Sequence, residues 1–211
     1  MDTRNSYARA DFGRINVYRK PLIALAIIPL TAAILFNVSA FAPDTFGHEA
    51  VEMVGLALIA LCIIGRTWSS MYIGGRKIET IVAEGPYSVV RNPLYVFSII
   101  GAVGIGMQLG SVTAGVLLGA LTLIFFYLMV LGEERVLLEL HGAPYRDYLK
   151  RVPRFLPDFS LWHDQETLRV SPRYVRSTFI DALFFLIAVP AFEALEGLQN
   201  SGALPIFFKV Y

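Results

Sequence analysis

The stretch that decides the fold runs from Asn92 to Gly132 and is NPLYVFSIIGAVGIGMQLGSVTAGVLLGALTLIFFYLMVLG, 41 residues without a charge. At about 1.5 Å of rise per residue, a single helix of this length would measure roughly 60 Å, about twice the hydrocarbon core of a bilayer. Glycine and polar residues gather near the middle, from Met107 to Ser111. The stretch therefore predicts a hairpin of two membrane helices that turns at this point.

The composition of the whole chain agrees with a membrane protein. Of the 211 residues, 55% are hydrophobic and 17% are charged, whereas an ordinary soluble domain has about 25% charged residues. The 18 Lys and Arg residues nearly balance the 17 Asp and Glu residues, which excludes the strongly basic surface of a nucleic-acid binder. The single cysteine, Cys62, excludes an internal disulfide, and because the three histidines are isolated in the sequence we predict no metal site.

Three further apolar segments extend the prediction. Pro21 to Pro43 has no charged residue, and Ala50 to Tyr72 is apolar except near its ends. Arg66, in the second of these, either snorkels to the interface or lines a polar cavity. Thr178 to Leu195 is weaker because Asp181 interrupts it. We therefore expect an all-α integral membrane protein with about five transmembrane helices, built around the central hairpin.

The distribution of Lys and Arg predicts the orientation. Five lie in residues 1–20, three in 74–91 and eight in 133–176, whereas the loop at 43–49 and the turn near 108 have none. Positive residues favour the cytoplasmic side of a membrane. We expect the N-terminus and both long polar segments to be cytoplasmic, in a bacterial inner membrane.

Both polar segments attach directly to the hairpin. An asparagine before proline is pushed away from helical angles, and proline suits the first turn of a helix, so the third membrane helix should begin at Pro93. The two open ends of a hairpin lie on the same side of the bilayer. We therefore expect one cytoplasmic site that brings together Arg91, Asn92, Tyr95, Glu133 and Glu134.

Five short motifs occur in order around the hairpin. They are Gly85-Pro86-Tyr87, Arg91-Asn92-Pro93-Leu94-Tyr95, Glu133-Glu134, Tyr145-x-x-Tyr148 and Arg151-Val152-Pro153. The ordered set resembles the integral-membrane S-adenosylmethionine-dependent methyltransferases, which include isoprenylcysteine carboxyl methyltransferase and phospholipid methyltransferases. The resemblance covers Tyr72 to Pro157. It implies a methyltransferase core in residues 1–157. Residues 158–211 carry no such resemblance, and from their sequence we expect an interfacial segment and the last membrane helix.

The resemblance also implies a cytoplasmic pocket for S-adenosylmethionine. Its residues would be Thr80, Ile81, Val82, Tyr87, Asn92, Pro93, Leu94, Tyr95, Gly104, Gly106 and Glu133, with Arg91 and Glu134 as catalytic residues at the edge of the reaction centre. Each signal has a simpler reading. The paired glutamates could be a solvated helix end, Arg91 a positive-inside anchor, and the two glycines sites of helix packing.

Two departures from the family pattern bear on the substrate. The family usually has histidine where this chain has Asn92, and an amide side chain cannot titrate. The prenylcysteine enzymes have an arginine four residues before the first glutamate, where this chain has Met129. The loss of that charged partner of a carboxylate counts against a prenylcysteine substrate.

The function expected from these residues is methyl transfer from S-adenosylmethionine to a lipidic or small hydrophobic acceptor at nitrogen, oxygen or sulfur. The acceptor would enter from the bilayer and the cofactor from the cytoplasm, and Glu134 or a water would take any proton that leaves. Two alternatives stay open. One is an NADPH-dependent reductase of the membrane sterol type, and the other is a non-catalytic membrane scaffold.

Overall fold

The computed structural model describes residues 37–39, 45–76, 79–201 and 208–210. In chain order the elements are β1 (Asn37–Ser39), α2 (Phe46–Ile73), α3 (Pro86–Val89), α4 (Pro93–Met107), α5 (Val112–His141), α6 (Ala143–Arg151), η1 (Phe159–Leu161), α7 (Pro172–Leu183), η2 (Phe184–Ile187), α8 (Ala188–Asn200) and β2 (Phe208–Val210). The prediction of an all-α membrane fold is confirmed for the body of the protein. The described chain also holds one short parallel pair, in which β1 lies beside β2.

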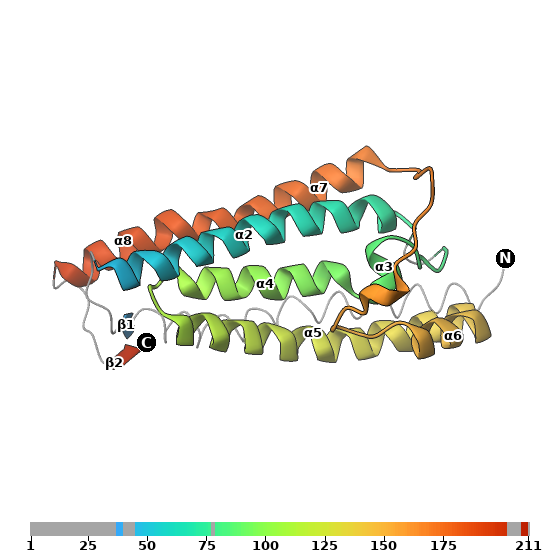
Figure 1. The fold of residues 1–211 in the computed structure, drawn as a ribbon, viewed down its shortest axis with the longest axis horizontal. Helices are drawn as coiled ribbons and strands as arrows, with labels where there is room; N and C mark the ends of the chain where they lie inside the picture. Colours follow the sequence, from blue (N-terminus) through green and yellow to red (C-terminus); the bar gives the residue numbers. More distant parts are fainter. Residues whose placement is uncertain (1–36, 40–44, 77–78, 202–207, 211) are drawn as a thin grey trace.

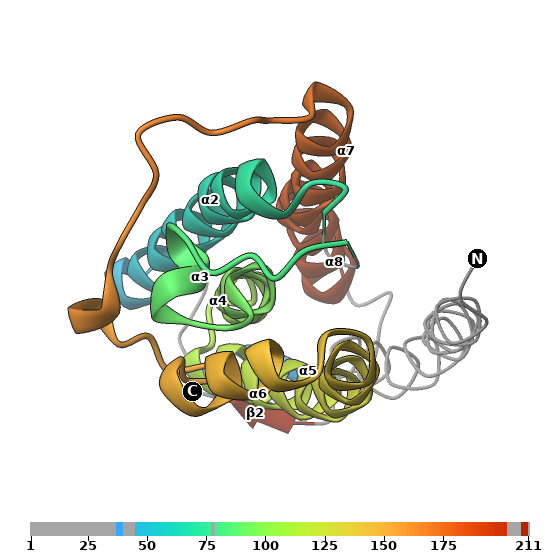
Figure 2. The same cartoon turned by 90° about the vertical axis from the view of Figure 1, so that its right-hand side faces the viewer.

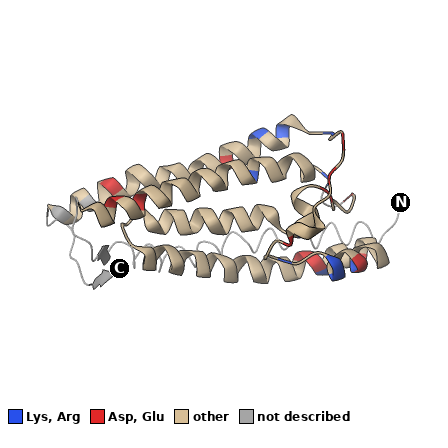
Figure 3. Ribbon diagram, viewed as in Figure 1, with Lys and Arg blue, Asp and Glu red and all other residues tan. Residues whose placement is uncertain are grey.

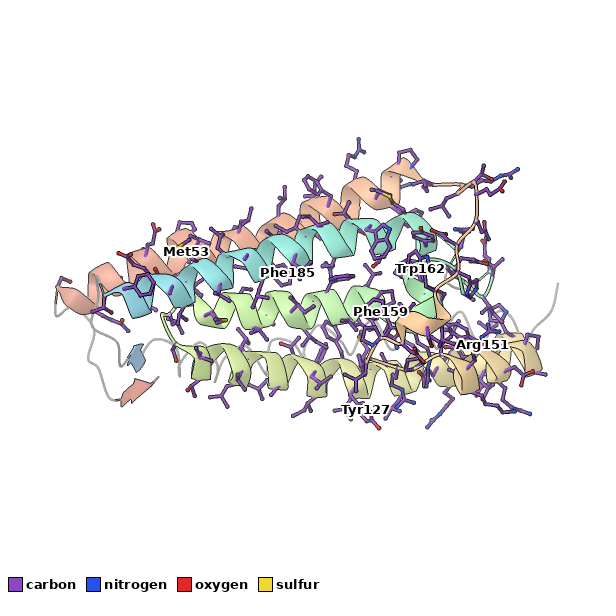
Figure 4. The ribbon with its side chains drawn as sticks, viewed as in Figure 1. Met53, Tyr127, Arg151, Phe159, Trp162 and Phe185 are labelled. Atoms are coloured by element: carbon purple, nitrogen blue, oxygen red, sulfur yellow. The ribbon has the colours of Figure 1, made fainter. Side chains whose placement is uncertain are left out.

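The long helices form a bundle with α4 at its centre. Figure 1 shows α4 between α2 and α5, and Figure 2 shows the same arrangement end on. The run from α7 through η2 to α8 packs along α2. Phe185, labelled in Figure 4, comes from this run and packs against a buried cluster of Ile59, Ile63 and Ala182. The arrangement leaves the ends of α4 and α5 next to each other.

The predicted hairpin is confirmed at both of its ends. The helix α4 begins at Pro93, as the Asn-Pro pair predicts, and ends at Met107. The helix α5 begins at Val112, where the hydroxyl of Ser111 accepts a hydrogen bond from the backbone of Ala114 at 3.2 Å. The turn between them needs a left-handed residue, which is Gly110 with φ +61°.

Two glycines allow α4 to approach its neighbours closely. A Cβ at Gly104 would lie 2.6 Å from the carbonyl oxygen of Gly55 in α2. A Cβ at Gly106 would lie 2.6 Å from the carbonyl oxygen of Ala114 in α5. Small residues at such contacts let helix backbones pack directly. The hairpin and its contact with α2 therefore depend on the absence of these two side chains.

Within the described residues, three helices are long and apolar enough to cross a membrane. They are α2, α5 and the continuous run Pro172–Gln199, which contains the weaker segment predicted at 178–195. The apolar helix α4 has 15 residues, about 22 Å, and is shorter than the spanning helix that the sequence predicts there. The bundle holds it between longer helices.

The predicted first span lies mostly outside the described residues, so the expected total of five spans is not confirmed. Within that span, residues 37–39 are described, and they form the strand β1 rather than helix. The backbone of these residues pairs with Phe208–Val210. That pairing replaces the hydrogen bonds that a helix would have made.

Charges on the described helices are unevenly placed. In Figure 3 the Lys and Arg residues lie in the half of the molecule that carries α3 and α6, while Asp and Glu residues appear at both ends. The side chain of Arg66 does not snorkel away from the bundle, because its guanidinium donates a hydrogen bond to the hydroxyl of Ser98 in α4. The polar end of the hairpin is thus the basic end.

We expect Gly104→Ala to lower the free energy of unfolding by about 1–3 kcal/mol, because the added methyl group would push α4 from α2. Thermal unfolding in detergent measures the change. Gly197→Ala is the matched control, since a Cβ at that position in α8 meets nothing within 4 Å. Equal unfolding temperatures for the two variants would contradict the packing role of Gly104.

Candidate functional site

A cavity lies at the basic end of the hairpin, where α2, α3, α4, α5 and α6 meet. Helix α4 contributes its first turn, and α5 contributes its end from Glu133 to His141. The lining residues are Ile73, Thr80, Ile81, Val82, Tyr87, Arg91, Asn92, Leu94, Tyr95, Glu133, Glu134, Leu137, His141, Tyr145 and Tyr148. The cavity therefore draws its walls from segments up to 75 residues apart in the sequence (Ile73 to Tyr148).

The short helix α3 carries Tyr87 into the wall of this cavity. Gly85 precedes the helix with φ +55°, and Pro86 occupies its first turn. Tyr87 is only 3% exposed, and among the described residues its hydroxyl has no hydrogen-bond partner. Burial raises the pKa of the Tyr87 phenol well above its ordinary value, so the hydroxyl keeps its proton and remains available as a donor.

A carboxylate and two guanidinium groups form the edge of the cavity. Glu134 Oε1 accepts from Arg91 Nη1 at 2.7 Å and from Arg154 Nε at 3.1 Å, and Glu134 Oε2 accepts from Arg154 Nη2 at 2.7 Å. Hydrogen bonding to Glu134 raises the pKa of the Arg154 guanidinium. Glu134 therefore connects the start of α4, the end of α5 and the chain that follows α6.

The chain after α6 is held over α3 by its backbone. We call residues 152–163 the closing segment. Arg91 donates from its backbone to Pro153 at 2.8 Å and from its Nε to Val152 at 2.6 Å, and the backbone of Gly85 donates to His163 at 2.9 Å. Figure 4 labels Trp162 on this segment, and its ring stacks on that of Trp68 in α2 at 5.9 Å. The closing segment thus covers α3 and fixes Arg154 beside Glu134.

The second glutamate points to a different partner. Glu133 Oε1 accepts a hydrogen bond from the hydroxyl of Tyr95 at 2.9 Å, and the Tyr95 ring stacks on Phe126 at 4.5 Å. Glu133 and Glu134 are 6% and 8% exposed. Both carboxylates are therefore buried in the bundle, and the reading of the pair as a solvated helix end does not hold.

Helix α6 closes the opposite wall with two tyrosines. Tyr145 and Tyr148 are both buried, their rings lie 5.9 Å apart, and the Tyr148 hydroxyl donates to the backbone carbonyl of Tyr87 at 2.9 Å. Burial raises the pKa of both phenols above its ordinary value. This wall is therefore neutral and aromatic over the accessible pH range.

Ten of the thirteen site residues that the sequence predicts line this one cavity. They are Thr80, Ile81, Val82, Tyr87, Arg91, Asn92, Leu94, Tyr95, Glu133 and Glu134. Pro93 is buried beside it at the first turn of α4. Gly104 and Gly106 are not brought to the cavity, because they pack against α2 and α5 further along α4.

The predicted site does not include Ile73, Leu137, His141, Tyr145 and Tyr148, which line the cavity, or Arg154, which lies at its edge. Arg154 follows the Arg-Val-Pro motif and could be found only by knowing where the closing segment runs. For His141 the sequence does hold a signal, because it lies eight residues after Glu133 and a spacing of four through Leu137 keeps all three on one helix face. Among the described residues, no group of three or more His, Cys, Asp or Glu side chains could hold a metal ion.

Comparison with known proteins identifies the family. Residues 51–143 match the family described as phospholipid methyltransferase. The chain belongs to this family of membrane methyltransferases. The family and the three apolar helices together make it an integral membrane protein.

Some of the individual relatives are named as metal-resistance proteins and others as methyltransferases. The nickel-cobalt-cadmium resistance protein NccN of Alcaligenes xylosoxydans is 34% identical over 164 residues, which cover 78% of this chain and 76% of the relative. The cobalt-zinc-cadmium resistance protein CzcN of Cupriavidus metallidurans is 29% identical over 90% of this chain and 85% of its own length. Protein-S-isoprenylcysteine O-methyltransferase of Schizosaccharomyces pombe is 32% identical over 46% of this chain and 42% of its own length. No solved structure matches the chain significantly.

We expect Glu134→Gln to lower the free energy of unfolding by about 1–3 kcal/mol and to expose the closing segment to chymotrypsin, because two half-buried guanidinium groups lose their counter-charge. Thermal unfolding and limited proteolysis measure these effects. Lys150→Met is the control, since its ion pair with Asp147 at 3.4 Å is exposed and should contribute little. A Glu134→Gln variant as stable and protease-resistant as Lys150→Met would refute the connecting role of Glu134.

Proposed function

We propose that this protein is an S-adenosylmethionine-dependent methyltransferase whose active site is the cavity at the basic end of the hairpin. The observation that carries the proposal is the convergence of ten predicted residues on one cavity in a chain of the phospholipid methyltransferase family. The basic character of that end supports a cytoplasmic site, from which a charged, water-soluble cofactor can enter.

The cavity suits this cofactor in charge and in hydrogen bonding. A buried carboxylate, Glu133, offers a counter-charge to a sulfonium cation, and buried aromatic rings can pack against its neutral parts. The buried hydroxyl of Tyr87 lacks a partner in the described part of the chain and can donate a hydrogen bond to an acceptor atom of a ligand. Buried polar groups are normally paired, so such an atom supports a binding role.

Bound S-adenosylmethionine would supply the activated methyl group, and the chain would orient the reactants and exclude water. Tyr95 holds the Glu133 carboxylate, and Arg91 fixes the start of α4 to the closing segment. Glu134 already accepts three hydrogen bonds from two guanidinium groups. These contacts favour a positioning role for Glu134, and a proton that leaves the acceptor would pass to water.

An apolar groove on the outside of the hairpin supports a hydrophobic acceptor that enters from the bilayer. It lies between α4 and α5, and the residues lining it are Val96, Ile99, Ile100, Leu123, Ile124, Tyr127, Leu128, Phe155 and Leu156. The guanidinium of Arg154 lies 5.3 Å from the centre of the Tyr127 ring, which belongs to the groove. The groove therefore ends beside the cluster of Glu134 and its arginines.

We expect the purified protein to bind labelled S-adenosylmethionine, and Glu133→Gln and Tyr87→Phe each to weaken that binding about tenfold, because a counter-charge or a buried donor is lost. Isothermal titration or equilibrium dialysis measures the affinity. Tyr174→Phe, an exposed tyrosine of α7 outside the cavity, is the control. Unchanged affinity in both cavity variants would overturn the pocket, and binding of NADPH in place of S-adenosylmethionine would favour the reductase alternative.

The acceptor can be found in cells that carry the chain. We expect membrane extracts of such cells to contain a hydrophobic species heavier by one methyl group, about 14 Da, and absent from cells carrying Glu133→Gln. Lipid mass spectrometry makes the comparison. Identical extracts from the two cultures would count against methyl transfer to a lipidic acceptor and favour the scaffold alternative.

A second proposal concerns the biological context of the activity. The names of NccN and CzcN support a contribution of this chain to resistance against nickel, cobalt, zinc or cadmium. We infer that such resistance would depend on methyl transfer. Growth in the presence of these metals, compared between cells carrying the wild type and cells carrying Glu133→Gln, tests the link. Equal resistance in the two cultures would show that resistance does not depend on methyl transfer.

A further inference from the structure

The cavity is elongated along α5 and its two ends differ in chemistry. Glu133 and His141 both line it and lie eight residues apart on one face of the helix, which separates them by about 12 Å along the helix axis. At the Glu133 end are Arg91, Tyr95 and Glu134, all polar or charged. At the His141 end lie the ring of Tyr145 and, one helical turn back on α5, the side chain of Leu137, so this end is apolar and aromatic apart from one imidazole.

The imidazole of His141 carries an atom that needs a partner. Its Nε2 is buried, and no hydrogen-bond partner for it exists within the part of the chain that the structure describes. The ring lies 6.4 Å from that of Tyr145, tilted against it. A buried ring nitrogen without a partner costs free energy in the empty site. It becomes favourable when a ligand supplies the missing donor or acceptor.

We propose that the His141 end of the cavity binds the adenine ring of the methyl donor, and that His141 Nε2 forms a hydrogen bond with the nitrogen edge of that ring. The inference rests on the proposed function and adds to it the residue that recognises the adenosyl group. A flat, neutral heterocycle suits apolar and aromatic walls, and its edge carries both donors and acceptors. The cationic sulfonium suits the opposite end, where the Glu133 carboxylate lies.

Two fragments of the cofactor separate the two ends experimentally. Adenosine has the heterocycle without the cation, and S-methylmethionine has the sulfonium without the heterocycle. Each fragment would compete with labelled S-adenosylmethionine on the purified full-length protein. We expect His141→Phe to weaken the binding of adenosine about tenfold and to change the affinity for S-methylmethionine by less than about twofold. We expect Glu133→Gln to weaken the binding of S-methylmethionine about tenfold and to change the affinity for adenosine by less than about twofold.

Two further variants distinguish recognition from a structural effect. His141→Gln can place an amide near the position of Nε2, and we expect it to restore most of the adenosine affinity. His163→Phe changes an exposed histidine of the closing segment, and we expect no change with either fragment. Thermal unfolding of all four variants shows whether each is folded.

The outcomes distinguish this inference from the proposed function. Two results would overturn the role of His141: an unchanged adenosine affinity in His141→Phe, or an equal loss of affinity for both fragments in that variant. In either case the proposed function stands as long as the protein binds S-adenosylmethionine. If neither fragment competes, the Kd of S-adenosylmethionine is measured in its place. We then expect this Kd to rise about tenfold in His141→Phe and to return towards the wild-type value in His141→Gln. A wild type that does not bind S-adenosylmethionine would overturn both.

Discussion

The structure depends on a constraint set by the bilayer. A charge-free stretch twice as long as a membrane is thick must turn back, and both of its polar ends then lie on the same side. Once α4 and α5 are packed against each other through Gly106, Arg91 at one end and Glu134 at the other are within reach. These two residues are 43 positions apart in the sequence, and the hairpin brings Arg91 Nη1 to 2.7 Å from Glu134 Oε1. The cavity lies beside this contact, since Arg91 and Glu134 both line it.

The hairpin explains which parts of the fold could be predicted from the sequence. Charge-free length, a glycine-rich turn and an Asn-Pro pair are local signals, and they predict the start of α4 and the turn before α5 at the observed residues. The contacts of Arg91 and Tyr95 with the paired glutamates follow from topology alone, since helices of a hairpin must lie side by side. These predictions needed no knowledge of how side chains pack.

The features that could not be predicted depend on tertiary packing. The Gly-x-Gly pattern that includes Gly104 is compatible with contact to a ligand or with packing against another helix. Only the position of Gly55 opposite Gly104 shows that this glycine packs against a helix. Arg154 enters the site because the closing segment folds back over α3, and that path depends on backbone hydrogen bonds to Gly85 and Arg91. His141 lies beyond the expected motifs, and it becomes a cavity residue because α5 continues about two and a half turns past its charge-free part.

The charge balance of the Glu134 cluster gives a physical reason for the most prominent departure from the family pattern. Two arginines and one glutamate give the cluster a net charge of +1, and its atoms are partly shielded from water. Asn92 lies beside it, and its amide donates to the backbone carbonyl of Arg154 at 3.3 Å. A histidine there would make that bond only in one tautomer or as a cation, and the cation would raise the net charge to +2. Asparagine provides the same donor at every pH, so the contact that holds the closing segment is independent of protonation.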